Sequence, residues 1–180
     1  MRKIILVNSE NTELLEEIKN VFKQKNIEYS ESDNVDFSDY TEEDLIIYTT
    51  FEKIELQTKT KAKILKLHPS LLPAFDCKNA IEEAYKTVKV TGVTVSKIQN
   101  EKEEILAQYP VLIGLTTNYC DLVNELKAIC KKLYPVVIDA VISDRVFDFW
   151  DLFKSGCSSN GSSCGSSCGG CGKCSNLIYY

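Results

Sequence analysis

The chain has a single histidine among its 180 residues, so any histidine chemistry has to use His68. It also lacks long apolar runs, because no stretch reaches the roughly 18 residues that a membrane-spanning helix needs. The apolar start, Ile4–Val7, is too short for a signal peptide and is followed at once by polar residues. These absences predict a cytoplasmic protein without a membrane partner.

The formal net charge of −5 is mild and spread along the chain. Nucleic-acid binding needs a concentrated basic face, so we expect no nucleic-acid partner. With 44% hydrophobic residues, the chain can bury a core of the size found in one average domain. We therefore expect one domain over residues 1–150, followed by a tail at 151–180.

Glycine is scarce outside the tail, since six of the eight glycines lie between Ser155 and Ser175. The segment Asn8–Glu13, which follows the first predicted strand, has none. Phosphate-binding enzymes of the α/β class usually place glycines there, because backbone amides must approach the phosphate closely. Glu10 and Glu13 would instead repel a phosphate, by about 1 kcal/mol or more per pair at short range. This segment is typical of a helix start whose acidic residues complement the helix dipole.

Hydrophobic periodicity predicts an α/β fold in which strands alternate with helices. The expected strands are Ile4–Val7, Ile27–Ser30, the acidic lead-in and β-rich run Glu42–Thr50, Ile64–Leu67, Val88–Val95 and Val111–Gly114. The expected helices are Thr12–Lys25, Ala80–Thr87 and Asn118–Ile142, with Asp76 or Asn79 as the cap of the second. This order indicates a mostly parallel sheet flanked by helices.

The tail is dominated by glycine, serine and cysteine, and from Ser155 to Ser175 it has no aliphatic side chain. Such a segment cannot form a core of its own. Four cysteines follow a regular spacing, Cys164, Cys168, Cys171 and Cys174. Flexible spacers would let four thiolates converge on zinc or on an iron–sulfur cluster. The alternative is a low-complexity tail that binds no metal.

The segment Leu65–Phe75 reads LKLHPSLLPAF and places His68 where an apolar strand meets two prolines, Pro69 and Pro73. A histidine at a strand end can simply cap a neighbouring carbonyl group. The segment also resembles the Asn-x-His-Pro-Ser-Leu-Leu-Pro motif of the folate-dependent formyltransferases, above all those that formylate glycinamide ribonucleotide. The resemblance continues through Ala80–Tyr85, Val88–Val95, Leu106–Gln108 and Lys132–Pro135.

This resemblance implies a Rossmann-like formyltransferase fold, shortened here by about one strand–helix unit. It also implies transfer of a formyl group from 10-formyltetrahydrofolate to an amine, a reaction of purine biosynthesis. The expected partners are therefore a small-molecule substrate and a reduced folate. Phe51–Leu56 departs from the family segment that helps to line the folate pocket.

The family's histidine is catalytic and works with two neighbours. An asparagine two residues earlier donates a hydrogen bond to the negative oxygen of the reacting carbonyl, and an aspartate raises the basicity of the histidine. In this chain the resemblance places His68 at the histidine, Lys66 at the asparagine and Glu101, after a two-residue shortening, at the aspartate. Residues 101–104 can also be read as a solvated run of charge.

These departures predict a divergent formyltransferase whose activity is impaired or lost. The alternative function is a non-catalytic scaffold that carries the cysteine-rich tail for metal binding or redox chemistry.

Overall fold

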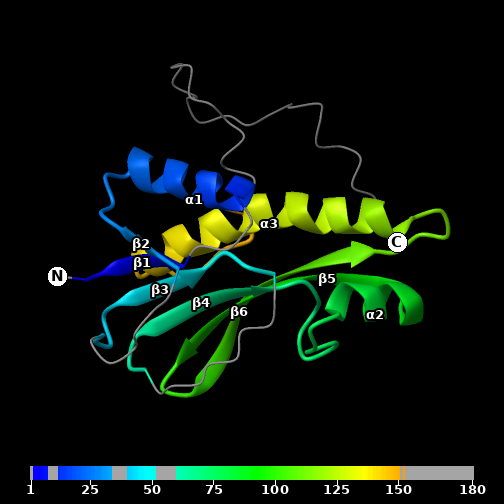
Figure 1. The fold of residues 1–180 in the computed structure, drawn as a ribbon, viewed down its shortest axis with the longest axis horizontal. Coiled ribbons are helices and arrows are strands. Elements are labelled where there is room, and N and C mark those ends of the chain that lie inside the picture. Colours follow the sequence, from blue (N-terminus) through cyan, green and yellow to red (C-terminus); the bar gives the residue numbers. More distant parts are fainter. Residues whose placement is uncertain (1, 8–11, 34–39, 52–59, 151, 153–180) are drawn as a thin grey trace, which may run out of the picture.

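The computed structural model describes residues 2–7, 12–33, 40–51, 60–150 and 152. Within this part of the chain, six strands form one sheet and three helices pack around it (Figure 1). The strands are β1 (Ile4–Val7), β2 (Ser30–Ser32), β3 (Leu45–Tyr48), β4 (Lys63–His68), β5 (Val90–Gln99) and β6 (Lys102–Leu112). The helices are α1 (Thr12–Gln24), α2 (Ala80–Thr87) and α3 (Tyr119–Ile142).

The sheet has the strand order β2-β1-β3-β4-β5-β6. The first three neighbouring pairs are parallel, whereas β4–β5 and β5–β6 are antiparallel. The predicted mostly parallel α/β sheet is therefore confirmed. Strands β1 and β3 are short, apolar and largely buried on both faces, as parallel strands usually are, whereas the edge strand β2 is polar and mostly exposed.

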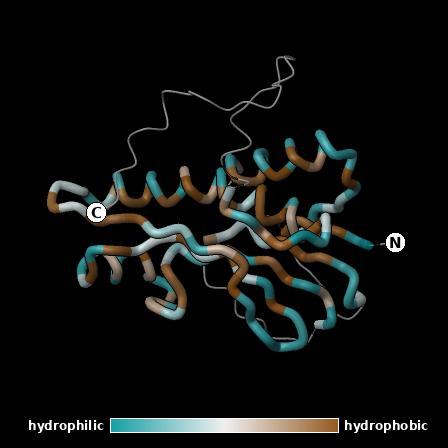
Figure 2. The backbone as a smooth tube through the Cα atoms, turned by 180° about the vertical axis from the view of Figure 1, so that it is seen from behind, coloured by the Kyte–Doolittle hydropathy of each residue, from teal (hydrophilic) through white to brown (hydrophobic). Residues whose placement is uncertain are grey.

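Helices α1 and α3 lie side by side on one face of the sheet, and α2 lies at the end where β5 begins (Figure 1). Figure 2 shows hydrophobic strands in the middle of the molecule, with alternating hydrophilic and hydrophobic residues along α1 and α3. The main core joins the apolar faces of these two helices to β1, β3, β4, β5 and β6. A smaller buried cluster, Ile5, Val7, Ile46, Ala62 and Ile64, lies on the opposite face of the sheet. No helix in the described part of the chain is long and apolar enough to span a membrane.

Helix α3 is fixed to the sheet at the carboxyl end of β3. The fully buried Tyr134 donates its hydroxyl hydrogen to the carbonyl of Tyr48 over 2.9 Å. At the start of the helix, the side chain of Asn118 accepts a hydrogen bond from the backbone N–H of Asp121, which caps α3. The predicted packing of this helix on the sheet is confirmed.

The differences from the sequence prediction include two strand starts and one helix cap. Strand β2 begins at Ser30 rather than Ile27, because the N–H of Ile27 bonds to the carbonyl of Phe22 and closes helix α1. Strand β6 starts nine residues earlier than predicted, at Lys102, because it pairs with β5 over the whole length of that strand. Asn79 precedes α2, but its side chain makes no capping hydrogen bond.

Candidate functional site

His68 is the last residue of β4, and Lys66 lies two residues before it on the same face of the strand. Across the β4–β5 ladder, His68 lies opposite Thr94 and Lys66 lies opposite Ser96. The sheet therefore places four polar side chains on one face, at the carboxyl end of a parallel strand. Ligands of open α/β sheets usually bind at such an end.

The imidazole of His68 is buried, with 4% of the residue exposed. Its Nε2 lies 2.9 Å from the carbonyl oxygen of Phe75. A carbonyl can only accept, so Nε2 carries the hydrogen and Nδ1 is the ring atom that can take up a further proton. Phe75 has a φ of 54°, and its carbonyl also accepts the backbone N–H of Cys77. A backbone turn thus sets the tautomer of the histidine.

Burial is the main reason why the pKa of His68 is lowered from 6.5. The ammonium of Lys66 lowers the pKa further, while the hydrogen bond to Phe75 and the carboxylates of Asp76 and Glu103 act in the opposite direction. The net result is a neutral imidazole at pH 7. A neutral ring with a free Nδ1 can act as a general base.

The loop after His68 is held against the sheet by Thr94, whose side chain is fully buried. Its hydroxyl donates to the carbonyl of Ser70 over 2.6 Å and accepts the N–H of Leu72 over 3.0 Å. Gln108 adds two bonds from its side-chain N–H₂, to the carbonyl of Leu72 and to the Thr94 hydroxyl. Strands β5 and β6 therefore position the loop that carries the carbonyl partner of His68.

Replacing Thr94 with valine is expected to lower the free energy of unfolding by about 1–2 kcal/mol, because it leaves the buried carbonyl of Ser70 and the partly buried N–H of Leu72 without their partner. Thr91 supplies a matched control on the same strand, since its hydroxyl is buried without any hydrogen-bond partner. Thr91→Val should be neutral or stabilising in urea denaturation. Equal losses in both variants would contradict the role assigned to Thr94.

Lys66 makes an ion pair with Glu103, a residue of β6, with 3.1 Å between Nζ and Oε1. The hydroxyl of Ser96 donates to the same carboxylate oxygen over 2.6 Å. The Lys66 side chain is mostly buried, at 13% exposure, whereas Glu103 is 38% exposed. Lysine, serine and glutamate thus form a connected group on the His68 face of the sheet. The sequence prediction did not include Glu103 or Ser96 in the site.

Glu101 lies in a different place from the other two predicted catalytic residues. It is exposed at the tip of the β5–β6 hairpin, where Asn100 and Glu101 both have positive φ, as in a type I′ turn. From Thr94, opposite His68, to Asn100 the strand runs about 20 Å at roughly 3.3 Å per residue. The structure brings His68 and Lys66 together and leaves Glu101 away from them; its catalytic role stays a prediction.

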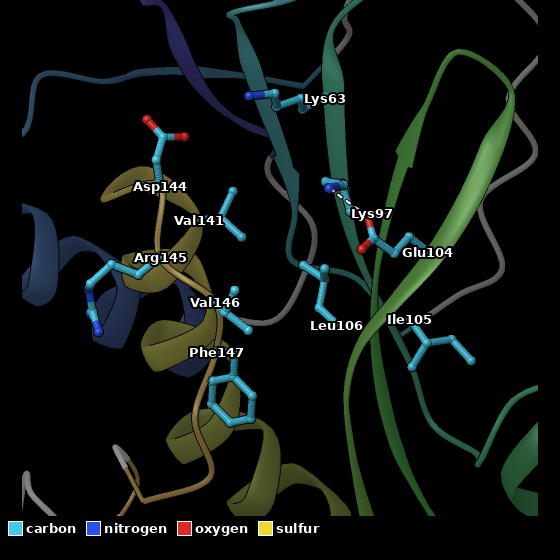
Figure 3. A pocket seen from close by; sticks show the side chains of 10 residues that line it. All are labelled: Lys63, Lys97, Glu104, Ile105, Leu106, Val141, Asp144, Arg145, Val146 and Phe147. Carbon is cyan, nitrogen blue, oxygen red and sulfur yellow. Dashed lines mark ion pairs between the residues drawn. The ribbon is translucent and has the colours of Figure 1, made fainter.

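A cavity of about 350 Å³ opens between the sheet and the chain after α3 (Figure 3). Its lining includes Lys63, Lys97, Glu104, Ile105, Leu106, Val141, Asp144, Arg145, Val146 and Phe147. Lys97 is opposite Leu65 in the ladder, and Leu65 belongs to the core under α3. The cavity therefore lies on the α3 side of the sheet, on the face opposite His68 and Lys66, and it does not belong to the histidine site.

The predicted metal ligands Cys164, Cys168, Cys171 and Cys174 lie outside the described residues, as do Asn8–Asn11 and residues 52–56. In the described part, Cys77, Cys120 and Cys130 are free thiols. No group of three or more potential ligands that could hold a metal ion occurs among the residues that the structure describes. The metal site of the tail therefore stays a prediction.

Comparisons with known proteins agree with the sequence motif. The sequence model of a family described as Formyl transferase matches residues 4–138. The chain is 34% identical over 91 residues to the human trifunctional purine biosynthetic protein adenosine-3, an alignment that covers 49% of this chain and 9% of that protein. The chain thus spans about a tenth of the length of this curated relative.

Solved structures share the fold at lower identity. Phosphoribosylglycinamide formyltransferase from Bacillus halodurans superposes with a TM-score of 0.58 and 21% identity, covering 82% of this chain and 100% of that chain. Glycinamide ribonucleotide transformylase 1 from Symbiobacterium toebii gives a TM-score of 0.60 and 20% identity, with 83% and 92% covered. A 4-N formyltransferase from Francisella tularensis gives 0.58 and 15%, with 81% and 71% covered.

Proposed function

Because the chain belongs to the formyl transferase family, we propose that it transfers a formyl group from 10-formyltetrahydrofolate to the amine of a small molecule, at a lower rate than members with the complete set of site residues. The observation that carries this proposal is the buried, neutral His68, whose tautomer is set by the carbonyl of Phe75. Glycinamide ribonucleotide is the first acceptor to test, because related proteins are named for it.

His68 supplies the proton transfers of this reaction. The attacking amine forms a bond to the formyl carbon and must lose a proton, which Nδ1 of the neutral imidazole can accept. The bond between the formyl carbon and the folate nitrogen then breaks, and the same proton can be returned to that nitrogen. The imidazole ends as it began, so the proton and the formyl group are both accounted for.

Lys66 supplies positive charge where the carbonyl oxygen becomes negative. An ammonium has three N–H donors, and the ion pair with Glu103 leaves others for an oxygen ligand. These residues support binding of the reacting end of the folate on this face, where 10-formyltetrahydrofolate would supply the formyl group when bound. The reduced rate follows from Lys66, because a flexible ammonium positions an oxyanion less well than a fixed side-chain amide.

The test is a binding and transfer assay on the full-length protein. A reduced folate should bind in calorimetry, and incubation with 10-formyltetrahydrofolate and glycinamide ribonucleotide should release tetrahydrofolate. We expect a kcat about a hundred-fold below that of a complete family member, the usual cost of one altered oxyanion donor. A panel of other small amines identifies the acceptor if glycinamide ribonucleotide is poor. Absence of folate binding would exclude the proposal.

The alternative function rests on the cysteine spacing of the tail. A metal-binding scaffold would contain stoichiometric zinc, or iron and sulfide, after anaerobic purification. Replacing Cys164, Cys168, Cys171 and Cys174 with serine would remove that metal, and His68→Ala would leave it bound. Colourless, metal-free protein that binds a reduced folate would reject this alternative and support formyl transfer.

A further inference from the structure

We propose that Glu103 is a positioning residue of the histidine site, which holds the Lys66 ammonium against the sheet beside His68. The inference rests on the function proposed above, because it assigns a task to Lys66 in that reaction. Its basis is geometric: one oxygen of Glu103 contacts Lys66 Nζ at 3.1 Å and receives the Ser96 hydroxyl at 2.6 Å. The Ser96 bond fixes the carboxylate, and the carboxylate in turn fixes a long, otherwise mobile side chain.

A β-bulge puts Glu103 on this face of the sheet. The β5–β6 register shifts between Val95 and Ser96, so that Leu106 is the extra residue of β6. After the shift, Glu103 lies opposite Ile98, on the face of Lys66, and Glu104 lies opposite Lys97, on the α3 face. Without the bulge the two glutamates would exchange faces, because successive side chains of a strand alternate.

The charged groups that act on His68 come from three segments. Strand β4 contributes Lys66, strand β6 contributes Glu103, and the loop after β4 contributes Asp76. Strand β5 contributes only uncharged side chains on this face of the ladder with β4, namely Thr94, Ser96 and Ile98. Glu103 therefore does two things: it restrains the ammonium, and it offsets the positive charge that Lys66 places near the imidazole. Loss of Glu103 should leave the ammonium mobile and its charge uncompensated.

The single histidine makes the test direct, because an NMR titration of the imidazole reports on His68 alone and needs no ligand. Glu103→Gln should shift the titration midpoint of His68 downward. Glu104→Gln is the matched control, since that neighbouring carboxylate pairs with Lys97 on the opposite face at 2.6 Å. It removes the same charge from the same strand and should leave the midpoint nearly unchanged.

A double-mutant cycle with Lys66→Met tests the pairing itself. Lys66→Met should shift the midpoint upward, and adding Glu103→Gln to it should have a different effect from Glu103→Gln alone, because interacting groups are not additive. Circular dichroism confirms that each variant is folded. If Glu103→Gln shifts the midpoint no more than Glu104→Gln, or if the cycle is additive, the positioning role is wrong.

Catalysis provides the second readout. Glu103→Gln should lower kcat of formyl transfer about tenfold with little change in KM for the folate, since positioning acts on the transition state. Glu103→Asp should recover part of that loss. If the double-mutant cycle shows the coupling but the wild-type protein transfers no formyl group, the proposed function is wrong and the pairing of Glu103 with Lys66 stands. If the wild-type protein transfers the formyl group but the cycle shows no coupling, the positioning role of Glu103 is wrong and the proposed function stands.

Discussion

Replacing His68 with alanine is expected to lower the rate of formyl transfer by about three orders of magnitude. General acid–base assistance contributes roughly a hundred- to ten-thousand-fold, and the chain has no second histidine that could supply it. The measurement is kcat/KM with 10-formyltetrahydrofolate and the best acceptor found. A loss smaller than tenfold would show that His68 is only the structural partner of Phe75.

A second variant separates that structural contact from the chemistry. His68→Gln keeps a side-chain N–H that can donate to the carbonyl of Phe75, but it has no atom that accepts a proton near neutral pH. It should therefore be more stable to urea than His68→Ala and equally inactive. Equal stability of the two variants would indicate that the bond to Phe75 contributes little to folding.

The pH dependence of the rate follows from the direction of the pKa shift. Burial, followed by Lys66, lowers the pKa of His68 from 6.5, so the neutral, proton-accepting form persists to a lower pH than in an exposed histidine. The acidic limb of the kcat/KM profile should therefore have its midpoint below 6.5. In the titration of the free protein, the same group should give the same midpoint, because kcat/KM reports on the free enzyme.

The fold could be predicted from the sequence where one hydrophobic pattern, either a continuous apolar run or helical spacing, dominates a segment. Ile4–Val7 is a continuous apolar run and forms β1, and the helical spacing of Leu14, Leu15, Ile18 and Phe22 gives α1, which buries these side chains. The sequence predicts too late a start for strand β6, because Lys102–Glu104 carry charge and show no apolar alternation. Their conformation comes from pairing with β5, a tertiary contact that local propensity does not encode.

The candidate site also has a part that local sequence indicates and a part that depends on strand pairing. The motif around His68 identified the strand end and the histidine, and family position identified Lys66. The resemblance placed Glu101 at the aspartate, a role that stays a prediction, and the carboxylate that pairs with Lys66 in the structure is that of Glu103. Position along a sequence does not reveal a β-bulge, and one inserted residue changes which side chains share a face. Thr94, Ser96 and Gln108 could have been found by following one face of β5 and β6 once that register was known.

Gly92→Ala is expected to cause the largest loss of stability of any single change considered for this chain. A Cβ at position 92 would lie 2.1 Å from the carbonyl oxygen of Tyr109 and 2.7 Å from Cδ2 of Leu71. The first clash is with the backbone of the paired strand β6, which cannot move without breaking the β5–β6 ladder. Overpacking of this severity typically costs 1–3 kcal/mol or more, so we expect a loss of about 3 kcal/mol in urea denaturation.

The second glycine in the described part of the chain provides the control. At Gly114 the nearest atom to an added Cβ is the Thr117 hydroxyl oxygen, a side-chain atom 3.3 Å away in an exposed loop. Gly114→Ala should therefore change the free energy of unfolding by less than about 1 kcal/mol. Equal effects of the two substitutions would contradict the close packing of β5 on β6.

The same clash connects the core to the histidine site. Leu71 belongs to the loop that Thr94 and Gln108 hold against the sheet, and this loop leads to the Phe75 carbonyl. An added methyl group at position 92 pushes on Leu71, so the molecules of Gly92→Ala that remain folded should have a displaced loop. Their His68 resonance should shift relative to the wild type, whereas that of Gly114→Ala should not. An unchanged resonance in both would show that the loop is positioned independently of the β5–β6 packing.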